Sequence, residues 1–304
     1  MGPTAVGKTT LALRVASALK AEIVSVDSMQ IYKLIDIGTA KPTVEEQRLV
    51  KHHMIDLVFP DERYSAAEYG VNARGVIESL YRQGICPLVV GGSGLYLRSL
   101  IEGIFEGPRA DQCLREQLRH ETELHGNETL YARLQEVDPQ AAQKIHLNDR
   151  IRLIRALEVY LLTGQPISSL QRLSPSFQLY SPFIVGLYRN RDELSRKIEE
   201  RVDAMISAGL VEEVRALKER GYTEDLTSMQ ALGYKEMLGY LNGRYDLATA
   251  ISLQKRETKR FAKRQMTWFR KVKGIHWINL SLVSEEESVA QILDYFQGQK
   301  SSDE

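Results

Sequence analysis

The chain has 304 residues, 43% of them hydrophobic and 26% charged, which is enough for one large domain or two smaller ones. Forty Lys and Arg residues balance forty Asp and Glu residues, so any basic surface for a nucleic acid has to be local. The two cysteines, Cys86 and Cys113, form no C-x-x-C pair, which argues against a zinc site or a disulfide framework. With no long apolar run and no signal-peptide pattern, we expect a cytoplasmic protein without a membrane span.

The stretch GPTAVGKT has the spacing of a phosphate-binding loop. Small residues let backbone N–H groups point at an anion, and the helix that follows adds its positive end. Lys8 supplies a charge, and the Thr9 hydroxyl can hold Mg²⁺. The alternative is an ordinary glycine turn. We predict a phosphate site formed by Gly2, Pro3, Thr4, Ala5, Val6, Gly7, Lys8 and Thr9.

A loop of this kind normally follows a buried strand, but only Met1 precedes it in this sequence. A parallel sheet without that strand would expose two edges. We therefore expect a further strand ahead of Met1, so that either the true start lies upstream or the chain has been trimmed.

Strands and helices alternate over the first hundred residues. Residues 8–21 are predicted as a helix, and the β-branched stretch 22–28 as a strand that ends at Asp27. The stretch 65–84 opens with a capping box, closes with a glycine and is predicted as a helix, before a buried strand at 85–92. This alternation predicts an α/β protein with a P-loop-type parallel sheet flanked by helices.

The pattern changes in the middle of the chain, which is polar and helical in its periodicity with no convincing strand. We interpret this part as an all-helical insertion domain, with hinges at 107–108 and 173–182. A strand at 181–188 then returns to the α/β core, and three more helices are expected after it. The three parts are 1–105, 106–180 and 181–304.

Several polar residues stand near the predicted strand ends. In nucleotide hydrolases a second strand ends in a metal-binding Asp, whereas here it ends in 91–94, GGSG, which suits a second backbone cradle or a tight turn. Asp27 could accept a proton from a nucleophile or cap the next turn. His52 and His53 are adjacent and point to opposite faces of a strand, so we interpret them as surface or structural residues. Asp56 is a weak metal candidate.

The strongest charge asymmetry lies between Lys255 and Lys273, where nine Lys or Arg residues accompany one acid, Glu257. Such a local excess is the pattern expected for binding a phosphate backbone, and the alternative is a solvated helix face. A second basic cluster lies in the insertion, at Arg150, Arg152 and Arg155. The apolar stripe of the basic helix that should face the core consists of Phe261, Trp268 and Val272.

In order and spacing, several stretches resemble the bacterial tRNA dimethylallyltransferases (tRNA isopentenyltransferases) over nearly the whole chain. They are GPTAVGKT, DSMQIYKLIDIGTAKP, YSAAEY, GGSGLYLRSL, VDPQAAQKIHLNDRIRLIRALEV, IEERVDAMISAGLVEEVRAL, QALGYKEM and AKRQMTWFRK. The resemblance implies Mg²⁺-dependent transfer of a dimethylallyl group from dimethylallyl diphosphate to the exocyclic N6 amine of an adenine, with release of diphosphate. That adenine lies 3′ of the anticodon in tRNAs that read codons beginning with U. We expect a monomer that binds the anticodon stem-loop of tRNA.

The resemblance also assigns roles to matching positions. Asp27 matches the general base, and Arg201 matches an arginine on the diphosphate. Lys8, Thr9 and Ser93 match positions around the diphosphate and its metal; many members carry Thr in place of Ser93, so the hydroxyl is kept. The positions that match tRNA contacts are Asp27, Ser28, Met29, Gln30, Ser93, Arg115, Ile151, Arg152, Leu153, Ile154, Arg155, Gln230, Ala231, Leu232, Gly233, Tyr234, Lys235, Lys263, Arg264, Gln265, Met266, Thr267, Trp268, Phe269 and Arg270.

Three other functions compete with this interpretation. A P-loop small-molecule kinase would share the first sixty residues in outline, but it would need a lid and no large basic surface. An adenylate prenyltransferase would act on a free nucleotide and lack the RNA-binding segments. A nucleotide-switched RNA-binding protein would need loops that respond to a γ-phosphate, for which the sequence gives no signal. We expect the loop to hold the diphosphate of a prenyl donor and not the tail of ATP.

Overall fold

The computed structural model describes residues 1–105, 107–173, 180 and 182–300. The chain divides into two compact units, one formed by Met1–Ile101 with Tyr180–Glu304 and the other by Glu102–Leu179. The second unit corresponds to the insertion predicted at 106–180. Within the described residues, no helix is both long and apolar enough to cross a membrane.

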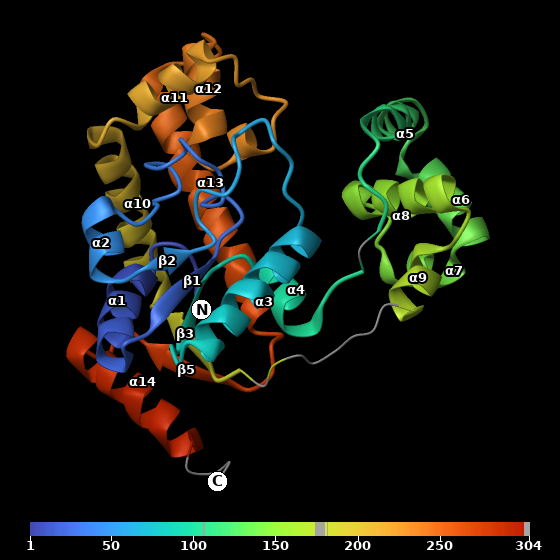
Figure 1. Cartoon of the computed structure of the whole chain (residues 1–304). Helices are drawn as coiled ribbons and strands as arrows, with labels where there is room; N and C mark the ends of the chain where they lie inside the picture. The colour runs from blue at the N-terminus through green and yellow to red at the C-terminus, as the bar shows by residue number, and fades with distance from the viewer. Residues whose placement is uncertain (106, 174–179, 181, 301–304) are drawn as a thin grey trace. The chain divides into compact units, whose positions relative to one another are not determined.

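The first unit contains two small parallel sheets (Figure 1). In one, β1 (Glu22–Val26) lies between β2 (His52–His53) and β3 (Pro87–Gly91). In the other, β4 (Ile184–Tyr188) pairs with β5 (Ile275–Asn279). The predictions of an α/β fold, of parallel strands and of the strands now seen as β1, β3 and β4 are confirmed. The sequence analysis missed β5.

Successive side chains of β1 point to opposite faces of its sheet, and helices cover both faces. Val26 packs with α3 (Ala66–Arg82) and α4 (Gly94–Glu102), whereas Ile23 packs with the alanines of α1 (Lys8–Leu19). The capping box predicted at the start of α3 is present. The carboxyl ends of β1 and β3 are therefore held rigidly next to the start of α1.

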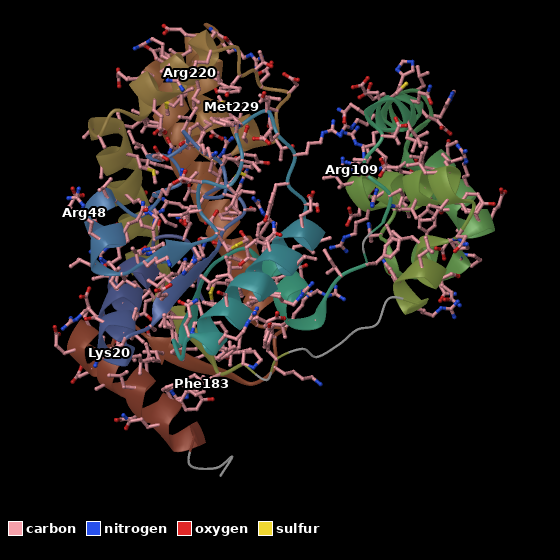
Figure 2. All side chains as sticks on the ribbon, viewed as in Figure 1. Lys20, Arg48, Arg109, Phe183, Arg220 and Met229 are labelled. Carbon is pink, nitrogen blue, oxygen red and sulfur yellow. The ribbon has the colours of Figure 1, made fainter. Side chains whose placement is uncertain are left out.

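More helices follow β4 than the three that were predicted, because glycines with positive φ interrupt the chain. Gly209, at φ 97°, precedes α11, and Gly233, at φ 92°, precedes α12. Met229, labelled in Figure 2, is buried in the core that these helices form. The remaining helices of this unit are α2 (Val44–Leu49), α10 (Arg191–Ser207), α11 (Leu210–Glu219), the 3₁₀ helix η1 (Ser228–Gln230), α12 (Tyr234–Leu241), α13 (Leu247–Phe269) and α14 (Glu285–Lys300).

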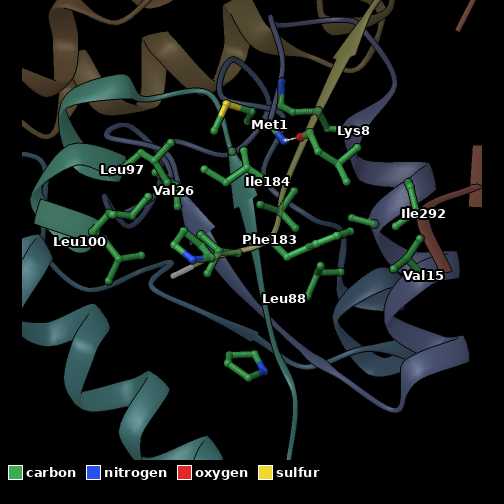
Figure 3. Close-up of a pocket in the computed structure, with 18 of the residues that line it drawn as sticks. Met1, Lys8, Val15, Val26, Leu88, Leu97, Leu100, Phe183, Ile184 and Ile292 are labelled. Atoms are coloured by element: carbon green, nitrogen blue, oxygen red, sulfur yellow. Dashed lines mark hydrogen bonds between the residues drawn. The ribbon is translucent and has the colours of Figure 1, made fainter. Parts of the chain in front are cut away.

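A cavity of about 390 Å³ separates β3 from β4, and apolar side chains of both strands line it (Figure 3). Met1 reaches one end of this cavity and pairs with β4: its amino group donates to Val185 O at 2.6 Å, and its carbonyl accepts from Leu187 N at 2.8 Å. These are the two bonds that a residue of a parallel strand would make opposite Gly186. The strand expected ahead of Met1 remains a prediction.

The second unit is built from helices around its own small core, and its described residues contain no strand. Leu130, Leu134, Leu153 and Leu157 are fully buried in that core. This core is made entirely of side chains of the second unit. Its helices are α5 (Gln112–His125), α6 (Asn127–Val137), α7 (Pro139–Lys144), α8 (Arg150–Thr163) and α9 (Ile167–Leu173).

Candidate active site and nucleic-acid interface

The predicted phosphate loop starts at Gly2, which lies beside β4, and ends in the first turn of α1. Gly2 packs against the backbone of Leu187, where a Cβ would come within 2.7 Å of the carbonyl oxygen. Ala5 and Gly7 have φ of 61° and 109°, so the loop turns sharply twice before the helix begins. Gly7 is the N-cap residue, and no side chain caps the helix. The first N–H groups of α1 are thus left for another acceptor, as at the anion sites of other helix N-termini.

Lys8 lies across the loop and is half-buried. Its ammonium donates to the carbonyl oxygens of Gly2 at 2.9 Å and Pro3 at 2.7 Å. Burial, and next the positive charge of Arg201, lower the pKa of Lys8 to about 7, while the Asp27 carboxylate acts in the opposite direction. Lys8 therefore holds the loop together and carries a charge that a bound anion would stabilise.

Asp27 follows β1 directly, as predicted. Its Oδ1 accepts from the backbone N–H of Met29 at 2.9 Å and of Gln30 at 3.4 Å, so the carboxylate does cap the next turn. Oδ2 accepts no hydrogen bond from the described part of the chain. Burial raises the pKa of Asp27, and the hydrogen bond from Met29 and the charge of Lys8 offset part of that effect. One oxygen therefore fixes the side chain, while the other has no hydrogen-bond donor among the residues that the structure describes.

Arg201 belongs to α10, far from Asp27 in the sequence, but its charge acts on both Lys8 and Asp27. Its positive charge lowers the pKa of Lys8 and favours the charged form of Asp27. Burial lowers the pKa of Arg201 itself, and Asp27 opposes that shift. The structure thus brings together three of the predicted catalytic residues, two cations and one carboxylate, beside the loop.

Ser93, the fourth predicted catalytic residue, lies at the end of β3. Its Oγ accepts from the backbone N–H of Ser28 at 3.0 Å and donates to the Ser28 hydroxyl at 3.3 Å. The N–H groups of Gly92 and Ser93 both donate to Val26 O at 3.1 Å. Ser93 therefore joins the ends of β1 and β3 and holds the turn that starts at Asp27.

Gln30 and Tyr234 were also predicted to contact RNA, and in the structure both hold the loop that follows β1. Gln30 accepts from Ser25 and donates to the carbonyl oxygens of Thr39 and Ala40. Tyr234 is fully buried; its hydroxyl donates to Glu213 at 2.5 Å and accepts from the N–H of Gly38.

Arg189, one residue beyond β4, is a site residue that the sequence analysis missed. Its Nε donates to Val6 O at 2.9 Å, and its Nη1 donates to Leu280 O at 2.6 Å and pairs with Glu193 at 2.5 Å. Arg189 therefore stabilises the phosphate loop by joining it to Leu280 and Glu193. The available signal was its position after a strand, since the carboxyl ends of parallel strands share one edge.

The charges of α13 are not all alike. Lys255 forms an ion pair with Asp203 at 2.6 Å and Lys259 one with Glu199, while Arg256 and Arg260 share Glu257. The second half of the helix differs, because its cations have no carboxylate within ion-pair distance in the described ranges. These exposed cations are Lys263, Arg264 and Arg270.

The prediction for the buried side of α13 was wrong for Phe261 and Val272, which are only half-buried. Trp268 is also half-buried and packs on the edge of the core. Because α10 and α12 pack closely against α13, its buried face holds small or polar side chains, apart from Phe269 at its end. They are Ala250, Gln254, Thr258, Ala262, Gln265 and Phe269.

The predicted RNA-contacting segments mix exposed and buried side chains. The buried ones point into the core, so their segments can contact RNA only through backbone or neighbouring side chains. They are Leu153, Ile154, Ala231, Tyr234, Gln265 and Phe269. The exposed side chains of these segments are Ile151, Arg152, Gln230, Lys263, Arg264, Thr267 and Arg270.

Arg115 and Arg155, in the second unit, are paired with the fully buried Glu158. Arg115 makes two parallel bonds to this carboxylate at 2.8 Å, and Arg155 makes a third at 2.6 Å. Burial alone would raise the pKa of Glu158, but the hydrogen bonds from Arg115 and Arg155 keep it below its usual value. Arg115 and Arg155 are thus not free cations. For Arg155 this differs from the prediction of a basic cluster at Arg150, Arg152 and Arg155.

The fold and the site define an α/β protein in which a glycine-containing loop, a half-buried carboxylate and two cations meet at the carboxyl ends of parallel strands. This is the usual place of the ligand in open α/β sheets. A family model described as IPP transferase matches residues 30–272, and the chain belongs to this family.

Relatives match the chain over almost its whole length. The tRNA dimethylallyltransferase of Thermosipho melanesiensis is 48% identical over 291 residues, which cover 96% of this chain and 95% of the relative. That of Alkaliphilus oremlandii is 46% identical over 300 residues, with 98% and 96% covered.

Two solved structures are similar in sequence and fold. The tRNA isopentenylpyrophosphate transferase of Bacillus halodurans has a TM-score of 0.72 and 40% identity, with 98% of this chain and 94% of that one covered. A eukaryotic dimethylallyltransferase acting on tRNA has a TM-score of 0.78 and 27% identity, with 98% and 78% covered.

Proposed function

We propose that this protein transfers a dimethylallyl group from dimethylallyl diphosphate to the N6 amine of the adenine 3′ of the anticodon, in tRNAs that read codons beginning with U. The names of the relatives support this activity. The observation that carries it is the meeting of Lys8, Asp27 and Arg201 beside the glycine-containing loop. The enzyme works as a monomer in the cytoplasm.

The loop Gly2–Thr9 binds the diphosphate of the donor as a P-loop. The uncapped N–H groups of α1 point at the anion, and Lys8 with Arg201 takes up the negative charge that grows as the allylic carbon–oxygen bond breaks. Thr9 is exposed in the first turn of α1, and a hydroxyl oxygen is a ligand that Mg²⁺ accepts. When bound there, Mg²⁺ would neutralise part of the diphosphate charge.

Asp27 is the base that takes a proton from the acceptor, the adenine of the tRNA. The exocyclic amine of adenine is a weak nucleophile, because its lone pair is delocalised into the ring. As the nitrogen forms a bond to the allylic carbon and diphosphate leaves with the electrons of the old bond, the amine loses a proton to Oδ2 of Asp27. Oδ1 keeps the carboxylate in place through Met29 N–H during this step.

The RNA lies along the second half of α13 and the residue after it, where Lys263, Arg264 and Arg270 are exposed and have no carboxylate partner in the described ranges. Their charges bind backbone phosphates and offset the cost of moving the adenine out of its stack, which is a few kcal/mol. In the insertion, Ile151 and Arg152 are the exposed members of the predicted contact segment and offer a second surface for the anticodon stem-loop.

A direct assay tests this function. The protein is incubated with labelled dimethylallyl diphosphate and unmodified tRNA, with and without Mg²⁺, and with ATP in place of the donor as a comparison. We expect label in tRNA, at the adenine 3′ of the anticodon, only when donor and Mg²⁺ are both present. Turnover of ATP without any transfer to tRNA would instead identify a small-molecule kinase.

A further inference from the structure

We infer that Gln265 is a positioning residue that holds the diphosphate loop in its binding conformation. This inference rests on the proposed function, because it concerns the loop that binds the donor. Gln265 belongs to the basic helix α13, yet its side chain points inward, away from any RNA, and is only 8% exposed. It lies where the loop and the end of β3 meet.

Both ends of the Gln265 amide are used. Its Oε1 accepts from the backbone N–H of Thr4 at 2.8 Å, and its Nε2 donates to the carbonyl oxygen of Gly92 at 3.0 Å. One bond needs an acceptor and the other a donor, so a carboxamide satisfies both at once. Losing the side chain would leave Thr4 N–H and Gly92 O without these partners, and a polar group that is shielded from water is destabilising when it has no hydrogen bond.

The glycines at the end of β3 fit the same explanation. A Cβ at Gly92 would clash with Nε2 of Gln265, and a Cβ at Gly94 would clash with the ring of Trp268. The sequence suggested a second backbone cradle or a tight turn for these glycines. In the structure they let two side chains of α13 approach the turn that carries Ser93.

The contacts of Gln265 link the two halves of the site. From Thr4 in the loop, the link runs through Gln265 to Gly92, and the next residue, Ser93, holds the turn of Ser28 and Asp27. Thr4 N–H is turned toward Gln265, which fixes the orientation of the peptide units that follow it in the loop. A small misplacement of a binding loop is enough to cost about two orders of magnitude in rate.

The first experiment compares Gln265→Met with Gln254→Met. Gln254 is a glutamine on the same helix, is also buried and has no hydrogen bond to the loop or to the end of β3, so it is a matched control. Calorimetry with inorganic diphosphate and Mg²⁺ should show a dissociation constant raised about tenfold or more in Gln265→Met and unchanged in Gln254→Met. Equal affinities in the two variants would overturn the inference. Because no prenyl transfer is measured, the result does not depend on whether tRNA is the acceptor.

The second experiment uses Gln265→Glu, which keeps the shape of the side chain. As a carboxylate, Glu faces the Gly92 carbonyl without a proton to donate, whereas as a carboxylic acid it restores one donor and one acceptor. The ratio of its diphosphate dissociation constant to that of the unchanged protein should therefore fall toward one as the pH is lowered from about 8 to about 5. The ratio cancels the titration of diphosphate itself. A ratio that stays above one and constant over this range would show a structural defect and not loss of positioning.

Discussion

Lys8 and Asp27 occupy one half-buried site in which each charge stabilises the other while partial burial opposes both. Burial lowers the pKa of Lys8 to about 7 and raises that of Asp27. Arg201 adds a second cation, which favours the charged carboxylate and disfavours the charged ammonium. Groups whose pKa values are moved toward neutrality are suited to exchange protons with substrates. An incoming diphosphate would restore the full charge of Lys8 and leave Asp27 as the base.

Replacing Asp27 by Asn separates the two tasks of this side chain. Asn keeps an oxygen that can accept from Met29 N–H, so the turn after β1 should remain capped. The base is lost, and the single-turnover rate should fall by about 10² to 10⁴. Affinity for tRNA should change little, because phosphate contacts elsewhere dominate it. A near-normal single-turnover rate in Asp27→Asn would contradict the assignment.

Donor binding should depend on pH through Lys8. Its pKa in the free protein is about 7, below the usual lysine value, so the side chain is charged below that pH and increasingly neutral above it. Since a bound diphosphate favours the charged form, the affinity for dimethylallyl diphosphate should fall as the pH rises above about 7, and binding there should take up a proton. Calorimetry in buffers of different ionisation enthalpy measures both effects.

Lys8→Met is the control for that experiment. Without the ammonium, the affinity should be lower at every pH, and any dependence that remains is that of diphosphate and Asp27. If the two proteins show the same pH dependence, Lys8 does not titrate in this range and its lowered pKa has no part in binding.

The charges of α13 should contribute unequally to RNA affinity. Lys263→Ala with Arg264→Ala removes two exposed cations that have no carboxylate partner among the described residues, and it should flatten the dependence of tRNA affinity on salt by roughly one unit of slope per lost contact. Lys255→Ala with Lys259→Ala removes the same charge, but from side chains paired with Asp203 and Glu199. This second pair should leave the slope nearly unchanged. Equal slopes for the two double variants would mean that only net charge matters.

Local patterns in the sequence predicted local structure well. The capping box of α3 and the apolar run of β3 could both be predicted, because residues a few positions apart determine them. By contrast, β5 is specified by pairing with β4, which lies about ninety residues away, and its sequence IHWIN alternates weakly. The partners of Lys255 and Lys259 come from α10, so counting charges on one helix overestimated the free cations. The role of Gln265 could not be predicted, because it depends on how α13 is rotated toward the loop.

The cavity between β3 and β4 is lined by side chains of both strands and ends at Met1. Met1 already makes both bonds of a residue in a parallel strand opposite Gly186, so residues joined ahead of it would fall opposite Val185, Ile184 and Phe183. The side chains that face this space are apolar on both sides. At its end lies the amino group of Met1, whose pKa is lowered to about 5, first by burial and then by the charge of Lys8. A peptide bond in that place would remove a buried ionisable group and continue the sheet.

Joining about five apolar, mostly β-branched residues to Met1 should therefore stabilise the protein. Filling a buried apolar cavity is worth about 2–5 kcal/mol, which in a chain of this size raises the melting temperature by several degrees. The gain should be larger at about pH 6 than at about pH 8. The folded pKa of the amine, about 5, lies below its ordinary value near 8, so the unextended chain must release a proton on folding between these pH values and is less stable at the lower one. An extension of equal length made of Gly and Ser removes the same amine but supplies no apolar side chains. It should therefore give the pH-dependent part of the stabilisation and little of the part that comes from filling the cavity. If the two extensions give the same melting temperature at both pH values, the cavity does not accept a strand.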